Sequence, residues 1–114
     1  MPGMVIDVAT GKPILQNKEG GISGYAMKPI AVRCVYDIYK AVKGRVPIIG
    51  SGGVVTGNDA LEMIMAGATA VQIGTGIYYR GIDVFRKVGE EIVAFMKKEG
   101  YTSLNEIRGL AHRD

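Results

Sequence analysis

Two glycine-rich stretches carry the residue types best suited to chemistry in this sequence. They are Gly50-Ser-Gly-Gly53 and Gly74-Thr-Gly76, and each follows a short apolar run typical of a buried strand. Glycine lets backbone N–H groups approach an anion without a Cβ in the way. Each loop taken singly is equally compatible with a tight turn. Two of them on consecutive strands indicate a phosphate site.

These loops do not fit a dinucleotide-binding fingerprint. Val54 breaks the G-x-G-x-x-G pattern that begins at Gly50, and no acidic residue follows at ribose-binding distance. The net charge of +3 comes from basic residues that alternate with acidic and apolar ones. That distribution is typical of solvated helix faces and disfavours nucleic acid as a partner.

Other reactive side chains have simpler interpretations. Cys34 is the only cysteine, so no disulfide framework or thiolate metal cluster is expected. Its helical spacing predicts a buried structural cysteine whose thiol nothing makes acidic. His112 lies near the C-terminus, where a solvated role is expected. Tyr78, Tyr79 and Arg80 follow the second glycine loop, within reach of a phosphate, although packing explains the tyrosines equally well.

The elements that must position these loops can be read from apolar periodicity and turn residues. Residues 3–8 and 12–15 predict a hairpin, with Pro13 on an edge strand. Apolar residues at helical spacing predict a helix from Ala26 to Lys43, with Pro29 in its first turn, Gly44 at its end and Lys28 on its outer side.

The remaining chain predicts two further strands and helices. Residues 46–50 and 70–74 read as strands buried on both faces. Thr56 and Asp59 predict a capping box, with Asn58 as a rival cap, for a helix that stops at Gly67. A short helix follows Thr75, and a last short helix is allowed within residues 103–109. A long helix is predicted over 83–98, before Gly100, with an inward face of Val84, Phe85, Val88, Ile92, Phe95 and Met96.

Strands that alternate with helices in this way predict an α/β fold with parallel β/α units. Two buried strands cannot form a covered sheet, and their outer edges would stay unpaired. The pattern therefore indicates a piece of a larger architecture. No apolar run approaches the ~18 residues of a membrane span, and a cytosolic protein is expected.

Several ordered motifs together resemble the C-terminal region of class 1 dihydroorotate dehydrogenases, with the B subtype as the closer match. They are Gly3-Met-Val-Ile-Asp7, Lys12-Pro-Ile-Leu15, Gly20-Gly-Ile-Ser-Gly24, Lys28-Pro29, Val46-Pro-Ile-Ile-Gly-Ser-Gly-Gly-Val54, Ala66-Gly-Ala68 and Ala70-Val-Gln-Ile-Gly-Thr75. The resemblance implies the C-terminal portion of a TIM (β/α)₈ barrel, as one domain over residues 1–114, in a protein that oxidises dihydroorotate to orotate in pyrimidine synthesis.

The resemblance also implies FMN as the cofactor. Carried over by position, Gly24 should lie against the flavin, and Gly52, Gly53, Gly74 and Thr75 should hold its phosphate. Ser23 and Ser51 are weaker candidates beside them. The family's catalytic cysteine, the lysine beside the flavin and the Asn-Thr pair that holds substrate would all precede Met1. We therefore expect no catalytic residue in this chain and no activity from it alone.

Three interpretations remain open from the sequence. The chain is part of an FMN-dependent dihydroorotate dehydrogenase that needs the N-terminal half of the barrel, and the B subtype implies a further partner carrying FAD and an iron–sulfur cluster. Alternatively, it is an FMN- or phosphate-binding half-barrel that dimerises to cover its open edges. A third possibility is a piece of another phosphate-binding βα-barrel enzyme, such as an isomerase or lyase.

Overall fold

The computed structural model of the protein describes residues 2–113. The chain begins with a long antiparallel hairpin in two ladders. Strand β1 (Pro2–Met4) pairs with β4 (Glu19–Gly21), and β2 (Ile6–Asp7) pairs with β3 (Lys12–Pro13). The predicted hairpin is therefore confirmed, and β1–β4 extends it. Pro13 lies in a two-stranded ladder, where its missing N–H costs no hydrogen bond to a third strand.

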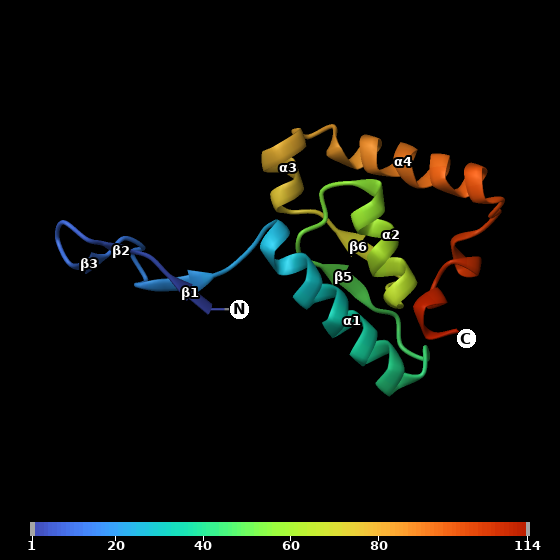
Figure 1. Cartoon of the computed structure of the whole chain (residues 1–114), viewed down its shortest axis with the longest axis horizontal. Coiled ribbons are helices and arrows are strands. Elements are labelled where there is room, and N and C mark those ends of the chain that lie inside the picture. The colour runs from blue at the N-terminus through green and yellow to red at the C-terminus, as the bar shows by residue number, and fades with distance from the viewer. Residues whose placement is uncertain (1, 114) are drawn as a thin grey trace.

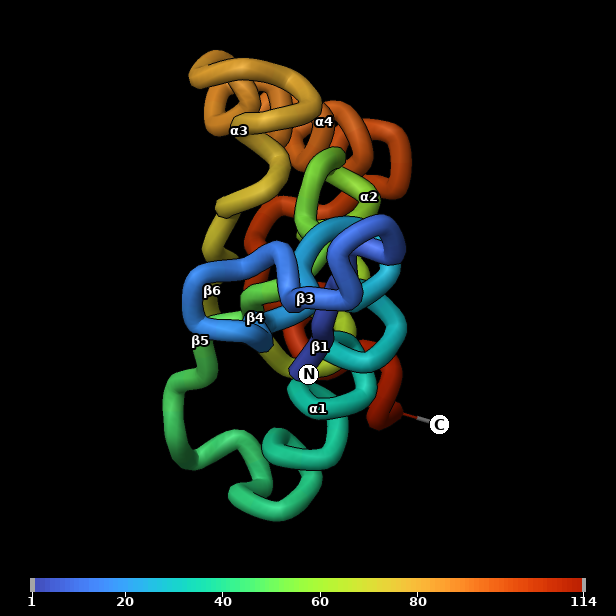
Figure 2. Tube along the Cα trace, turned by 90° about the vertical axis from the view of Figure 1, so that its left-hand side faces the viewer, coloured from blue at the N-terminus to red at the C-terminus, as the bar shows by residue number. Residues whose placement is uncertain are grey.

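This hairpin forms an arm that projects away from the rest of the molecule (Figure 1), and Figure 2 looks onto the end of this arm with the body behind it. The molecule consequently measures 57 × 33 × 20 Å. The arm buries little of its apolar surface, and Val8 at its tip is 94% exposed.

The body begins with a short 3₁₀ turn, η1 (Tyr25–Met27), and helix α1 (Lys28–Val42). Pro29 lies in the first turn of α1, as predicted, because its ring fits where no intrahelical N–H bond is needed. The helix ends with Lys43 and Gly44 in the left-handed region, at φ 55° and 71°.

Strands β5 (Ile49–Ser51) and β6 (Ala70–Gln72) pair in parallel and are joined through helix α2 (Gly57–Ala66). The predicted β/α order is confirmed. The capping box is also confirmed, because the Thr56 hydroxyl accepts from the Asp59 N–H while the Asp59 carboxylate accepts from the Thr56 N–H. Asn58 lies within the first turn of α2, so the alternative that it caps the helix is wrong.

The prediction that both strands are buried on both faces is wrong. Gly50 is buried, and a Cβ built there would lie 3.2 Å from Ala68 Cβ. Ile49, by contrast, is 61% exposed, and Ala70 is also exposed. Among the described residues the helices cover one face of this two-stranded sheet, and the other face stays open.

Helices α3 (Thr75–Arg80) and α4 (Val84–Glu99) follow β6, and two 3₁₀ turns, η2 (Leu104–Glu106) and η3 (Leu110–His112), end the described chain. Helix α2 packs against both α1 and α4 (Figure 1). Gly100 caps α4 as predicted. Val84 and Val88 of α4 are buried, but Phe85 is 50% exposed, so its predicted inward position is wrong.

The core lies between α1, α2, α4 and the covered face of the sheet. Its buried members are Ala31, Val35, Ile48, Val54, Ala60, Met63, Ala66, Ala68, Val84 and Val88. A second cluster forms where Ile107 packs on Leu61 and Ile64. Within residues 2–113, no helix combines the length and apolar character needed to cross a bilayer.

Candidate phosphate-binding site

The loop after β5 requires glycine at two consecutive positions. Gly52 and Gly53 have φ of 121° and 73°, in the region that side chains rarely adopt. A Cβ on Gly52 would lie 2.9 Å from Ala31 Cβ of α1. Glycine at these positions therefore lets the loop turn sharply and pack closely on α1.

The loop after β6 leads directly into α3. Gly74 caps this helix at φ −115°, and a Cβ built on it meets no other atom within 4 Å. Gly76 is buried, and a Cβ there would lie 2.7 Å from the Val54 carbonyl oxygen. Glycine at position 76 thus brings α3 against the loop after β5. The N–H groups of the first turn of a helix have no intrahelical partner and are available to a ligand.

A third segment reaches the same place from the end of the hairpin arm. Gly24 is buried at φ 94°, and its carbonyl accepts from the Met27 N–H at 3.0 Å. That carbonyl oxygen would lie 2.9 Å from a Cβ built on Gly53. The segment before α1 and the loop after β5 are therefore in direct contact.

These three segments line one pocket of about 100 Å³. Its lining residues are Ser23, Gly24, Ser51, Gly52, Gly53, Gly74 and Thr75. The structure thus brings together the five residues singled out from the sequence and the two weaker serine candidates. These lining residues carry backbone amides and three hydroxyls and include no carboxylate, a donor set that suits phosphate oxygens.

Two of the larger hollows lie elsewhere and have a different character. One of about 510 Å³ runs along α4, and one of about 430 Å³ lies beside α1. The lining surface of both is mainly apolar, so neither offers the converging amides that hold a phosphate.

Residues 78–80 of α3 contribute less to the pocket than their position directly after the second glycine loop suggests. Arg80 Nη1 donates to the Val55 carbonyl oxygen at 3.0 Å and to Glu91 Oε1 at 2.6 Å, so its guanidinium is engaged away from the pocket. Tyr78 is 86% exposed. Tyr79 lies closer, with its hydroxyl 3.7 Å from a Cβ built on Gly24.

Two predictions about reactive side chains are wrong. Cys34 is exposed, because the side of α1 on which it lies has no packing partner in the described chain. His112 is partly buried, not solvated, because its ring stacks on Tyr36 and its Nε2 lies 2.7 Å from the Ala66 carbonyl oxygen.

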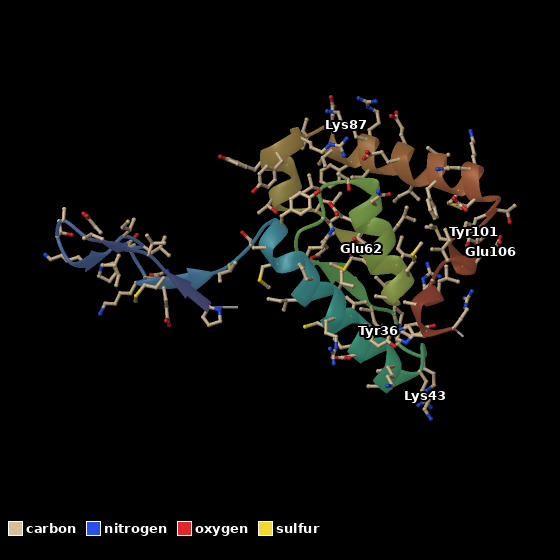
Figure 3. All side chains as sticks on the ribbon, in the orientation of Figure 1. Tyr36, Lys43, Glu62, Lys87, Tyr101 and Glu106 are labelled. Atoms are coloured by element: carbon tan, nitrogen blue, oxygen red, sulfur yellow. The ribbon has the colours of Figure 1, made fainter. Side chains whose placement is uncertain are left out.

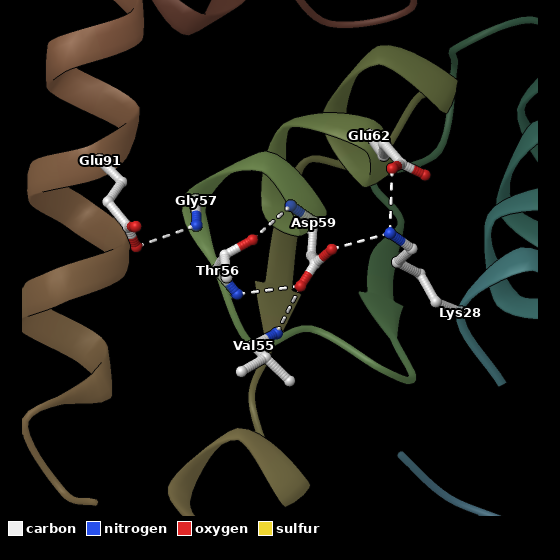
Figure 4. A network of polar contacts seen from close by, with 7 residues as sticks. All are labelled: Lys28, Val55, Thr56, Gly57, Asp59, Glu62 and Glu91. Carbon is white, nitrogen blue, oxygen red and sulfur yellow. Dashed lines mark hydrogen bonds and ion pairs between the residues drawn. The ribbon is translucent and has the colours of Figure 1, made fainter. Parts of the chain in front are cut away.

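An ion pair next to the pocket was not predicted. Lys28 is not on the outer side of α1, since its Nζ lies 2.8 Å from Asp59 Oδ1 of α2 (Figure 4). Burial by itself raises the pKa of Asp59, but hydrogen bonds from Lys28, Thr56 and Val55 outweigh it and lower that pKa. The capping box identified Asp59, but periodicity along α1 could not identify its partner.

Comparisons with known proteins extend over most of the chain. The sequence model of a family described as dihydroorotate dehydrogenase matches residues 1–96. The catalytic subunit of dihydroorotate dehydrogenase B (NAD(+)) from Methanocaldococcus jannaschii is 56% identical over 110 residues, covering 96% of this chain and 35% of that protein. The corresponding subunit from Pyrococcus furiosus is 49% identical over 113 residues, covering 99% and 37%.

A solved structure of a dihydroorotate dehydrogenase has a similar fold. The crystal structure of ligand-free DHODH from Eimeria tenella superposes with a TM-score of 0.80 at 42% sequence identity, over 83% of this chain and 26% of that one. The chain thus spans about a third of the length of the curated relatives it matches.

Proposed function

Because this chain belongs to the dihydroorotate dehydrogenase family, we propose that it forms the part of a B-type catalytic subunit that holds the FMN phosphate. The observation that carries this proposal is the convergence of Gly24, Gly52-Gly53 and Gly74-Thr75 on one small pocket. Parallel strands β5 and β6 end at this pocket, and the carboxyl ends of strands are where βα-barrel sites form.

The lining residues fit a phosphate in both shape and chemistry. Gly74 leaves open space where another residue would place a Cβ. The hydroxyls of Ser23, Ser51 and Thr75 add side-chain donors to the backbone amides. In this proposal Gly24 contacts the flavin side of the cofactor, and the two loops after the strands bind its phosphate.

The family is one of oxidoreductases that use flavin, and FMN, when bound, accepts the electrons removed from dihydroorotate as orotate forms. The residues of this chain bind and orient the phosphate end. We assign no general base to them, since Cys34 and His112 both lie outside the lining of the pocket. Oxidation of dihydroorotate is therefore proposed for the whole protein, with its catalytic residues outside this chain.

The open face of the sheet is the proposed contact with the remainder of a (β/α)₈ barrel. Strands β5 and β6 pair only with each other in the described chain. An apolar hollow lies beside α1 and includes Ile30, Ile38 and Ile49, which are 40%, 49% and 61% exposed. Relatives about three times as long contain additional chain that would cover it. The relatives' designation as catalytic subunits supports a partner subunit. We propose that this partner is the electron-transfer subunit with FAD and an iron–sulfur cluster that the B-type resemblance implies.

Flavin titration of the chain with Gly74→Asp and Gly74→Asn tests the cofactor assignment. Position 74 tolerates either side chain, because φ is −115° and no atom lies within 4 Å of a Cβ built there. Aspartate should weaken FMN binding by at least about tenfold, because it brings a negative charge to a dianion. Asparagine has nearly the same shape and should bind much more tightly than aspartate. Equal FMN affinities for the two variants would refute phosphate binding in this pocket.

A sedimentation experiment separates a barrel segment from a self-paired half-barrel. If two copies cover each other's open faces, the chain should sediment as a dimer that Ile49→Lys dissociates. Val8→Lys, on the 94% exposed tip of the arm, is the matched control. A monomer that forms a complex with the N-terminal part of the M. jannaschii relative supports the leading proposal.

A further inference from the structure

Lys28 connects helix α1, helix α2 and the Gly52-Gly53 loop at the edge of the candidate phosphate pocket. It is the first residue of α1, and its Nζ donates to Asp59 Oδ1 at 2.8 Å and to Glu62 Oε1 at 3.1 Å (Figure 4). The Lys28 side chain is 20% exposed, and that of Asp59 is 3% exposed. This ion pair is therefore largely removed from water, where losing one partner leaves the other poorly solvated.

Asp59 also binds the backbone that follows the Gly52-Gly53 loop. Its second carboxylate oxygen accepts from the Val55 N–H at 3.0 Å and from the Thr56 N–H at 2.9 Å. One carboxylate thus holds both the ammonium of α1 and the two amides after Val54. Movement of Lys28 would change the hydrogen bonds that fix this backbone.

The stem of Lys28 packs on the loop itself. A Cβ built on Gly53 would lie 2.7 Å from Lys28 Cβ, 2.9 Å from the Gly24 carbonyl oxygen and 3.0 Å from Lys28 Cα. The two lining segments, 23–24 and 51–53, therefore meet at Lys28. The residue itself is absent from the lining of the pocket.

We propose that Lys28 is a positioning residue for the phosphate pocket, which holds the Gly24 segment against the Gly52-Gly53 loop through its packing on Gly53 and its ion pair with Asp59. This inference rests on the proposed function, because it concerns the same pocket. Direct attraction of the phosphate by Lys28 is a weaker explanation, since two carboxylates already neutralise the ammonium. The contribution of Lys28 is the geometry of the amides, on which a preorganised anion site depends.

The experiment compares FMN with riboflavin, which has the same ring system but no phosphate. Dissociation constants for both are measured by flavin fluorescence on the wild-type chain, Lys28→Met and Lys28→Arg. The ratio of the two constants is unaffected if a variant is partly unfolded, because both ligands lose the same fraction of binding sites. It therefore separates a positioning role from a purely structural one.

Lys28→Met keeps an apolar stem but loses the ion pair. It should weaken FMN binding by about tenfold, comparable to the loss of an outer-shell partner at a metal site. Riboflavin binding should weaken much less than FMN binding, because only the Gly24 contact with the flavin is affected, and Lys28→Arg should recover much of the loss of FMN binding. Arg33→Met is the matched control, because Arg33 is another α1 cation whose pair with Asp37 is exposed. It should leave both constants unaltered.

The outcomes distinguish the inference from the proposal beneath it. If the wild-type chain binds FMN no more tightly than riboflavin, phosphate binding and the positioning role both fail. If the wild type prefers FMN and Lys28→Met keeps the same preference, the positioning role alone is overturned. Equal losses for both flavins would make Lys28 a structural residue and would also overturn it.

Discussion

The rings of Tyr36 and His112 stack face to face, with centroids 4.0 Å apart and an interplanar angle of 11°. Tyr36 lies on α1, on the side that faces the C-terminal turns (Figure 3). The Nε2–H of His112 also donates to the Ala66 carbonyl oxygen, at 2.7 Å, at the end of α2. A single side chain thus fastens the last 3₁₀ turn to two helices of the body.

We expect His112→Ala to lower the free energy of unfolding by about 2 kcal/mol, the sum of a stacked pair and one hydrogen bond. Urea unfolding followed by circular dichroism measures the change. His112→Phe keeps an aromatic ring but cannot donate to Ala66, so its loss should be smaller. A His112→Ala variant as stable as the wild type would mean that the stacked ring and the hydrogen bond of His112 contribute nothing to stability.

The capping box of α2 gives a second prediction with a control two residues away. Thr56→Ala removes the hydroxyl that accepts from the Asp59 N–H at 3.3 Å and should cost about 1 kcal/mol of unfolding free energy. Asn58 is exposed and is not the cap, so Asn58→Ala should have little effect. The reverse order of the two losses in urea unfolding would make Asn58 the true cap.

Local signals in the sequence predicted the parts of the structure that depend on local interactions. The Thr56–Asp59 box, Pro29 in the first turn of α1 and Gly100 after α4 each act within a few residues. Gly24, Gly52 and Gly53 of the candidate site have positive φ that side chains rarely adopt, a local requirement that a glycine in the sequence can signal. Gly74 has no such requirement, and only its place directly after a predicted strand singled it out.

The predictions that failed depend on what lies opposite an apolar side chain. Cys34 and Phe85 have helical spacing suited to burial, yet both are exposed because the described chain places nothing against them. Ile49 on β5 is exposed for the same reason. The prediction for Lys28 failed in the opposite way, because a side chain expected on the outer side of α1 is largely buried. Its partner Asp59 lies 31 residues away, and no local pattern links the two. Periodicity reports which residues share a face, and only the tertiary structure reports what covers it.

Acid should destabilise the protein through Asp59. Hydrogen bonds outweigh the effect of burial and hold its pKa below the ordinary value, so ionised Asp59 stabilises the fold above that value. This contribution is lost as pH falls below about 4 and through the folded-state pKa. Glu91 and Glu106 also have lowered pKa values, chiefly through hydrogen bonds from Arg80 and Thr102 respectively, and act in the same direction.

Urea unfolding of the wild type and of Asp59→Asn at several pH values between neutral and about pH 3 isolates this contribution. The wild type should be the more stable at neutral pH, and the difference should shrink as the carboxyl becomes protonated. A difference that stays constant over the whole range would show that the Asp59 charge has no part in stability. The acid dependence that remains in Asp59→Asn should come from the other carboxyls.

Replacing glycine by alanine should lower the stability of the protein at Gly67 and raise it at Gly89. Gly67 ends α2 at φ 129°, and a Cβ there would overlap the ring of Tyr39. Gly67→Ala should cost about 2 kcal/mol or more, because overpacking adds to backbone strain. Gly89 lies inside α4, with a φ outside the left-handed region and no atom within 4 Å of a Cβ built on it. Gly89→Ala should therefore stabilise the helix by about 0.5–1 kcal/mol.

Thermal and urea unfolding of the two variants test this contrast, since each change adds one methyl group to a glycine. Only the surroundings of the added methyl differ, a packed ring at position 67 and open space at position 89. A destabilised Gly89→Ala would indicate that this face of α4 is covered in solution, because an added methyl costs stability where it meets a neighbour. Sedimentation of Gly89→Ala at several concentrations would then show whether a second copy supplies that cover.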